Sequence, residues 1–158
     1  MDKQRKFTFI GALLLVILSA IAASAQNKPP ADAQGTTYTL TIHMTGFRSA
    51  VGAAGVLVFC SPKGWPESNA DACEHNSVPI QNGEATIKFD GLKAGTYAAV
   101  ALHDENRNKK LDRNFIGIPK EGFGFPNNIR VGLRPPSYEA ASFKVDGDTT
   151  IEIKIQYK

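Results

Sequence analysis

The sequence predicts an all-β protein, a single antiparallel β-sandwich of about seven strands. Several segments of strand length alternate apolar and polar side chains with a period of two, which is typical of half-buried strands. Turn residues separate these segments at short intervals, and no stretch keeps a helical period between capping residues. The sequence shows neither an internal repeat nor a second domain.

Two apolar segments open the sandwich. Residues 37–44 alternate, with four apolar side chains on one face: Tyr38, Leu40, Ile42 and Met44. Residues 56–60 form a continuous apolar run, which indicates a more fully buried strand.

Turn residues place the remaining strands. Pro79 limits residues 78–80 to a short edge strand, because proline cannot donate to a ladder. Asn82-Gly83 indicates a hairpin turn into an alternating strand, a second turn is expected at residues 90–95, and an apolar central strand follows. The last two strands are expected in these segments: 139–145 and 149–157.

The first 25 residues have the features of a cleaved signal peptide. Lys3, Arg5 and Lys6 precede an uncharged apolar run over residues 9–23, and Ala23-Ser24-Ala25 is a small-x-small cleavage site. A membrane span needs about 20 apolar residues, more than this run offers. We therefore expect export to the periplasm or the extracellular space, with no stable membrane insertion after cleavage. An uncleaved membrane tether is the alternative.

Cleavage would leave a flexible leader at residues 26–35 and the sandwich domain at residues 36–158. The remaining 15 cationic and 14 anionic residues give a net charge of +1. A nucleic-acid-binding protein would show a larger cationic excess, so we expect no nucleic-acid partner.

Cys60 and Cys73 are the two cysteines of the chain. An even number of cysteines in an exported protein predicts a disulfide, and closing a loop of this size contributes about 3 kcal/mol. Two free thiols are the alternative. The bond would fix the loop at residues 61–77, whose tryptophan, Trp65, either anchors the loop or stacks on a sugar or peptide.

Oxygen-bearing groups alternate along residues 104–112 in the order Asp104, Asn106, Asn108, Lys110 (backbone carbonyl) and Asp112. This spacing resembles that of a calcium loop. Lys109, however, stands where a glycine normally makes the sharp turn, and Phe115 replaces the bidentate glutamate. Glu121 could complete the site only if the chain folds back.

The alternative is that these side chains accept hydrogen bonds from the backbone, as Asp and Asn commonly do in turns. Both interpretations stay open at this point. An all-oxygen set would select calcium over zinc or copper, and no other cofactor is expected.

The following segment, residues 117–128, contains Phe123 and Phe125 next to glycines. It forms either a recognition loop at one end of the sandwich or, together with Phe115, an apolar plug for the core. We do not expect an enzyme, because the three histidines lack metal-ligand spacing. The alternative is a carboxylate-based hydrolase or transferase acting near Asp104 and Glu121.

Three segments together resemble domain-of-unknown-function family 2141, a family of small exported bacterial proteins. They are GLKAGTYAAVALHDEN at residues 91–106, LDRNFIGIPKEGFGFPN at 111–127 and RPPSYEAASF at 134–143. The resemblance implies an immunoglobulin-like or transthyretin-like β-sandwich without an established activity. We predict an exported binding or structural module that interacts with a protein or an envelope polymer, with Trp65, Phe123 and Phe125 as candidate binding residues.

Overall fold

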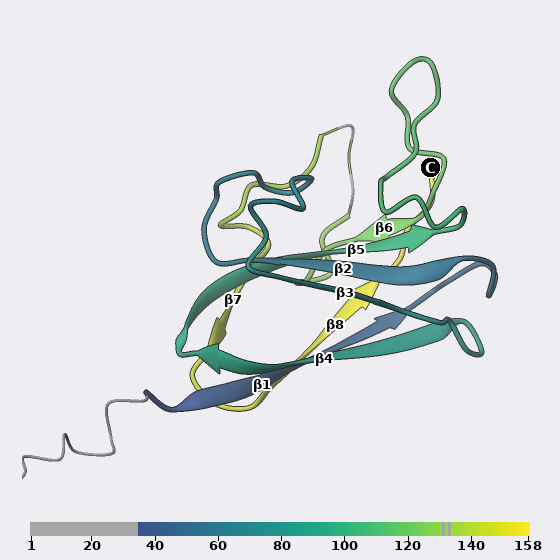
Figure 1. Ribbon diagram of the computed structural model, residues 1–158. Coiled ribbons are helices and arrows are strands. Elements are labelled where there is room, and N and C mark those ends of the chain that lie inside the picture. The colour runs from purple at the N-terminus through teal and green to yellow at the C-terminus, as the bar shows by residue number, and fades with distance from the viewer. Residues whose placement is uncertain (1–34, 131, 133) are drawn as a thin grey trace, which may run out of the picture. The chain divides into compact units, whose positions relative to one another are not determined.

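A computed structural model describes residues 35–130, 132 and 134–158 of the protein. These residues form eight strands and no helix, so no described helix could cross a membrane (Figure 1). The strands are β1 (Thr37–Thr45), β2 (Ala53–Phe59), β3 (Glu74–Val78), β4 (Glu84–Lys93), β5 (Gly95–Asp104), β6 (Phe123–Gly124), β7 (Ser142–Val145) and β8 (Thr149–Lys154). The predicted signal peptide and all but the last residue of the predicted leader lie outside the described residues.

The strands form two packed sheets, which confirms the predicted β-sandwich. One sheet has the order β4-β1-β8, and the other has the order β3-β2-β5-β6 with β7 also paired to β5. Side chains from both sheets fill the space between them, including Leu40 and Ile42 of β1 and Val58 of β2. These positions are fully buried because the period of two directs every second side chain inward.

One strand pair departs from the predicted antiparallel arrangement. β8 pairs with β1 in parallel, with Ile42 opposite Ile151 and Met44 opposite Ile153. The reason is that β7 and β8 lie in different sheets, so the turn at residues 146–148 carries the chain across the sandwich instead of forming a hairpin. The Asp148 carboxylate anchors this turn by accepting a hydrogen bond from the Thr39 amide, at 2.9 Å.

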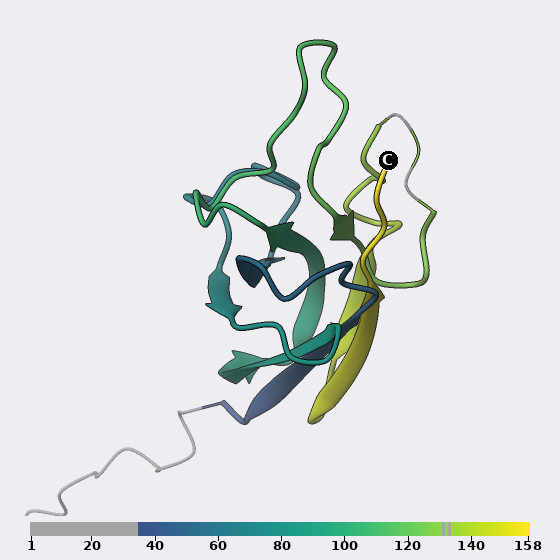
Figure 2. The ribbon, with the colours of Figure 1, turned by 90° about the vertical axis from the view of Figure 1, so that its right-hand side faces the viewer.

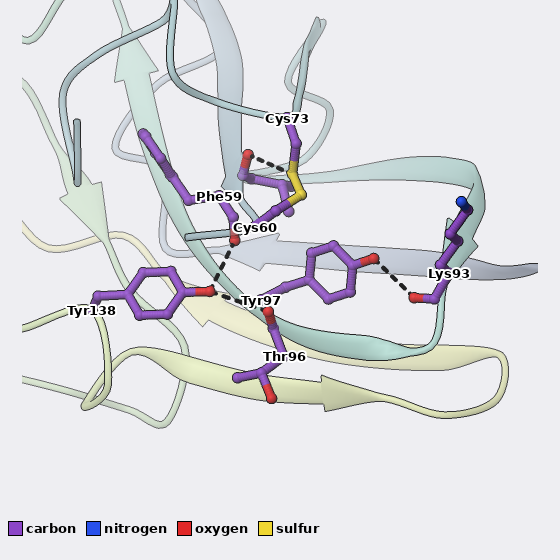
Figure 3. Close-up of a disulfide and its surroundings, with 8 residues drawn as sticks. Phe59, Cys60, Cys73, Lys93, Thr96, Tyr97 and Tyr138 are labelled. Carbon is purple, nitrogen blue, oxygen red and sulfur yellow. Dashed lines mark hydrogen bonds between the residues drawn. A yellow bond between two sulfur atoms is a disulfide. The ribbon is translucent and has the colours of Figure 1, made fainter. Parts of the chain in front are cut away.

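The predicted disulfide between Cys60 and Cys73 is present (Figure 3). The sequence analysis predicted an edge strand at residues 78–80, but the edge strand is β3, at Glu74–Val78. The disulfide explains this difference. The bond brings Cys73 beside β2, where its amide donates to the Val58 carbonyl at 2.9 Å. β3 therefore begins at the next residue, Glu74, and pairs with β2 back to Val78.

Two further details differ from the sequence prediction. The second turn is tighter than residues 90–95, since β4 continues to Lys93 and β5 begins at Gly95. The short strand β6 was not predicted. It pairs Gly124 with Ala101 of β5, and a Cβ at Gly124 would lie only 2.4 Å from the Lys154 carbonyl oxygen, so only glycine fits there.

A smaller apolar cluster covers the outer side of β5. Phe123 and Phe125 are its buried aromatic residues, and Trp65 and Tyr138 pack against them. The indole N–H of Trp65 donates to the Pro136 carbonyl at 2.9 Å. The Tyr138 hydroxyl donates to the Thr96 carbonyl at 3.1 Å (Figure 3). The cluster thus joins the disulfide loop to the segment before β7.

Substitution Phe125→Ala should lower the free energy of unfolding by about 3–5 kcal/mol, because it empties the place of a side chain that is only 2% exposed. The control is Phe115→Ala, which removes a ring that is 99% exposed and should change stability by less than about 0.5 kcal/mol. Urea denaturation measures both. Equal effects of the two substitutions would contradict the placement of these rings.

Candidate functional site

The most distinctive feature of the fold is the connection between β5 and β6, residues 105–122, which we call the hairpin arm. It projects from the end of the sandwich (Figures 1 and 2). Its two legs are the segment that leaves β5 and the segment that returns to β6. At the base, the His103 amide of β5 donates a hydrogen bond to the Gly122 carbonyl. Farther out, the Lys120 amide donates to the Asp112 carbonyl, and Arg113 forms an isolated antiparallel β-bridge with Pro119. The arm is therefore an ordered hairpin-like extension of the sheet.

Asp104, the last residue of β5, caps the first leg. Its side chain is 5% exposed, and its two oxygens accept hydrogen bonds from the amides of Asn108 (3.0 Å) and Lys109 (2.8 Å). Lys109 and Arg107 have left-handed backbone angles, with φ of 62° and 60°. Such angles cost non-glycine residues about 1–2 kcal/mol each, and the hydrogen bonds to Asp104 offset part of this cost.

Glu121 ties the second leg to the first. It is 4% exposed, and its two oxygens accept hydrogen bonds from the amides of Glu105 (2.9 Å) and Asp112 (3.0 Å). The chain does fold back, as a calcium site completed by Glu121 would require. The Glu121 oxygens, however, accept hydrogen bonds from backbone N–H groups there. Hydrogen bonds from neutral donors to a buried carboxylate are among the stronger ones in proteins.

The predicted calcium ligands are engaged with protein donors. Asn106 and Asn108 direct their oxygens at backbone amides and their NH₂ groups at the two oxygens of Asp112. Lys110 contributes its amide to Asn108. Within the described part of the chain, no three His, Cys, Asp or Glu side chains are grouped to hold a metal. This geometry favours the backbone-capping interpretation, and calcium binding stays a prediction.

A buried histidine beside the arm was missed in the sequence. His103 is fully buried, with Nε2 at 2.8 Å from the Val51 carbonyl and Nδ1 at 2.7 Å from the Tyr157 hydroxyl. A carbonyl can only accept, so Nε2 carries a proton, and in the neutral ring Nδ1 accepts from the Tyr157 hydroxyl. The period of two could have revealed it, since it places His103 on the inward face with Ala99 and Ala101.

Arg48 and Glu105 cover the Tyr157 side of this histidine. Arg48 pairs with Glu105 at 2.7 Å, and its guanidinium lies 4.6 Å above the centre of the Tyr157 ring. Burial raises the pKa of the Tyr157 hydroxyl above its usual value. The cluster closes the end of the sandwich between the β1–β2 loop and the base of the arm.

The candidate binding residues chosen from the sequence are buried or half-buried. Phe123 and Phe125 are buried, and Trp65 is half-buried against Phe59 and Tyr138. Phe123 and Phe125 are buried, as the plug interpretation expected, but they pack in the cluster on the outer side of β5 and not in the core between the sheets. Phe115 is 99% exposed and belongs to no plug. The difference in exposure has a topological reason. Phe123 lies in β6 and Phe125 directly after it, whereas Phe115 lies in the turn of the arm.

The large apolar side chains exposed among the described residues gather at one end of the sandwich. Phe115 (99% exposed), Ile116 (63%) and Ile118 (38%) form what we call the apolar tip of the arm. Val51 (63%) lies outside the arm, just before β2, whose first residue pairs with Asp104.

The bacterial family described as "Uncharacterized protein conserved in bacteria (DUF2141)" matches residues 42–153. The chain belongs to the DUF2141 family. No curated protein and no solved structure matches it. The match extends from β1 to β8, so the hairpin arm and its caps are part of the DUF2141 domain.

In the described part of this DUF2141 domain, Asp104 lines a pocket without a second carboxylate. A cavity of about 280 Å³ beside Asp104 is lined by Arg107 and Lys109, and neither Glu121 nor any other acid joins Asp104 there. A carboxylate-based hydrolase would need two acids facing one substrate bond. The geometry gives that alternative no support.

Substitution Asp104→Asn should lower the free energy of unfolding by about 1.5–3 kcal/mol, because one backbone amide would then face the NH₂ group. The loss should be the same in calcium and in chelator. The control, Asp146→Asn, alters an exposed turn and should leave stability within about 0.5 kcal/mol. A calcium-dependent rise in the melting temperature of more than about 1 °C, abolished by Asp104→Asn, would favour a bound ion instead.

Substitution Tyr157→Phe should destabilise the protein by about 1–3 kcal/mol, because it leaves buried Nδ1 of His103 without its donor. A raised folded-state pKa means that the contribution of Tyr157 is complete below its ordinary value of 10.0 and is lost as the pH rises through the folded-state pKa. Wild type should therefore lose stability above pH 10 more steeply than Tyr157→Phe. Identical alkaline denaturation profiles would contradict this assignment.

Proposed function

We propose that this DUF2141 domain is an exported, non-catalytic binding module that attaches to a component of the cell envelope through the apolar tip. The observation that carries the proposal is the full exposure of Phe115 at the end of an arm braced by buried carboxylates. An exposed aromatic side chain on an ordered support loses little conformational freedom when it binds. Aromatic residues are also enriched among those that dominate binding energies.

The acids of the arm support a structural role over a catalytic one. Asp104 and Glu121 each accept two backbone hydrogen bonds, so both oxygens of each are occupied. A general acid or base needs an oxygen that can reach the substrate. The exposed side chains of the arm are instead apolar, cationic or neutral amides.

Two features support export. The Cys60–Cys73 disulfide is a bond that persists in oxidising compartments. The signal-peptide pattern at the N-terminus predicts the same route. The small net charge of the predicted exported chain, +1, is the reason for choosing an envelope component over a nucleic acid.

The test is cosedimentation with purified bacterial envelopes. Wild type should bind, and the double substitution Phe115→Ser/Ile116→Ser should weaken binding at least about tenfold, because burying each such side chain contributes about 1.5–3 kcal/mol. Val51→Ser is the matched control, since Val51 has the same 63% exposure as Ile116 but lies outside the arm.

Equal binding by wild type and the double variant would contradict the assignment of the tip. A hydrolytic activity that Glu121→Gln abolishes without unfolding the domain would contradict the non-catalytic part of the proposal. Thermal denaturation of each variant shows that the fold is retained.

A further inference from the structure

Cationic residues lie on both sides of the apolar tip along the chain. Residues 107–120 contain five cationic residues and one anionic residue, Asp112, a net charge of +4. The predicted exported chain as a whole carries only +1, so the remainder is anionic by −3. Over the whole arm, residues 105–122, Glu105 and Glu121 reduce the net charge to +2, which still exceeds the +1 of the exported chain. The cationic residues of the arm are Arg107, Lys109, Lys110, Arg113 and Lys120.

Several of these cations are free to contact a ligand. Lys109, Lys110 and Lys120 are exposed, and no hydrogen bond or ion pair involves their ammonium groups in the part of the chain that the structure describes. Arg113 pairs with Glu67, and Arg107 donates to the Gly52 carbonyl at 3.2 Å. The three lysines thus form the available charge.

Four backbone amides around the tip are already hydrogen-bonded, whereas the Phe115 amide has no acceptor among the described residues. The side-chain oxygen of Asn114 accepts from the amides of Ile116 (3.1 Å) and Ile118 (2.9 Å). The Asn114 amide donates to the Ile118 carbonyl, and the Gly117 amide donates to the Asn114 carbonyl. Backbone groups that enter lipid must be satisfied internally, because the hydrocarbon offers no partners. Four amides of the turn meet that requirement.

The arrangement of the arm is also that of an interfacial anchor. Exposed apolar side chains occupy its turn, at Phe115, Ile116 and Ile118, and the lysines precede and follow that turn in the sequence. A convex tip needs a deformable surface or a matching groove in its partner. Peripheral membrane segments combine an aromatic or aliphatic contact with cations that reach the lipid headgroups.

We propose that the hairpin arm docks on an anionic lipid bilayer. Phe115 and Ile116 enter the boundary between headgroups and acyl chains, and Lys109 and Lys110 contact the lipid phosphates. This inference rests on the proposed envelope binding and names its target.

The test is cosedimentation with vesicles of phosphatidylglycerol and phosphatidylcholine in equal parts, compared with vesicles of phosphatidylcholine alone. The protein is recovered from bacteria that express the full chain, and all variants share one N-terminus, so their differences report on the arm. Wild type should prefer the anionic vesicles, and added salt should weaken binding. Lys109→Gln/Lys110→Gln should weaken it roughly 25-fold, at about fivefold per cation.

Lys93→Gln/Lys144→Gln is the charge-matched control, because these exposed lysines lie at the opposite end of β5. It should bind anionic vesicles like wild type. In Phe115→Trp, the added indole should shift its emission to the blue on binding and be quenched by brominated acyl chains. Equal loss in both lysine pairs, or an unquenched indole, would overturn the proposal.

The experiments distinguish failure of the lipid inference from failure of the proposed envelope binding. Tip-dependent binding to envelopes without binding to anionic vesicles would overturn the lipid inference and point to a protein or polymer partner. Absence of binding to both would overturn the proposed function as well.

Discussion

Two buried carboxylates hold the long connection between β5 and β6 in place. Asp104 and Glu121 are each about 5% exposed or less, and together they accept four backbone amides from the arm. Removing a carboxylate from water is costly unless hydrogen bonds replace the lost hydration. Each buried acid needs hydrogen-bond donors, and each of these amides needs an acceptor. The path of the chain through the arm is the one that lets them form these four hydrogen bonds.

This constraint links the sandwich to its exposed tip. Asp104 ends the central strand β5, and Glu121 stands two residues before β6, so the arm begins and ends on paired strands of one sheet. The strain of left-handed Arg107 and Lys109 is contained within the same hydrogen-bonded unit. Among its exposed side chains the arm offers the apolar tip and three lysines without an ion pair to any described residue, which is the combination on which the proposed function depends.

Much of the sandwich could be predicted because alternation with period two is a local signal, as in β1. The position of β3, the short β6 and the parallel pairing of β8 could not, since each depends on a distant partner: Cys60, Ala101 and β1. The arm shows the same limit more sharply. A row of Asp and Asn oxygens is equally typical of an ion site and of capped turns, and only the placement of the amides distinguishes them. Likewise, composition alone could not separate exposed Phe115 from buried Phe125.

Amide hydrogen exchange, followed residue by residue by NMR, tests the central claim most directly. If the two carboxylates fix the arm, the amides of Glu105, Lys109 and Asp112 should exchange roughly a hundredfold or more slowly than in an unstructured chain. The amide of Phe115, for which the described part of the chain offers no acceptor, should exchange freely. Glu121→Gln should release the protection at Glu105 and Asp112 in particular. Unprotected exchange at all of these amides in the wild type would show a mobile loop and contradict the account.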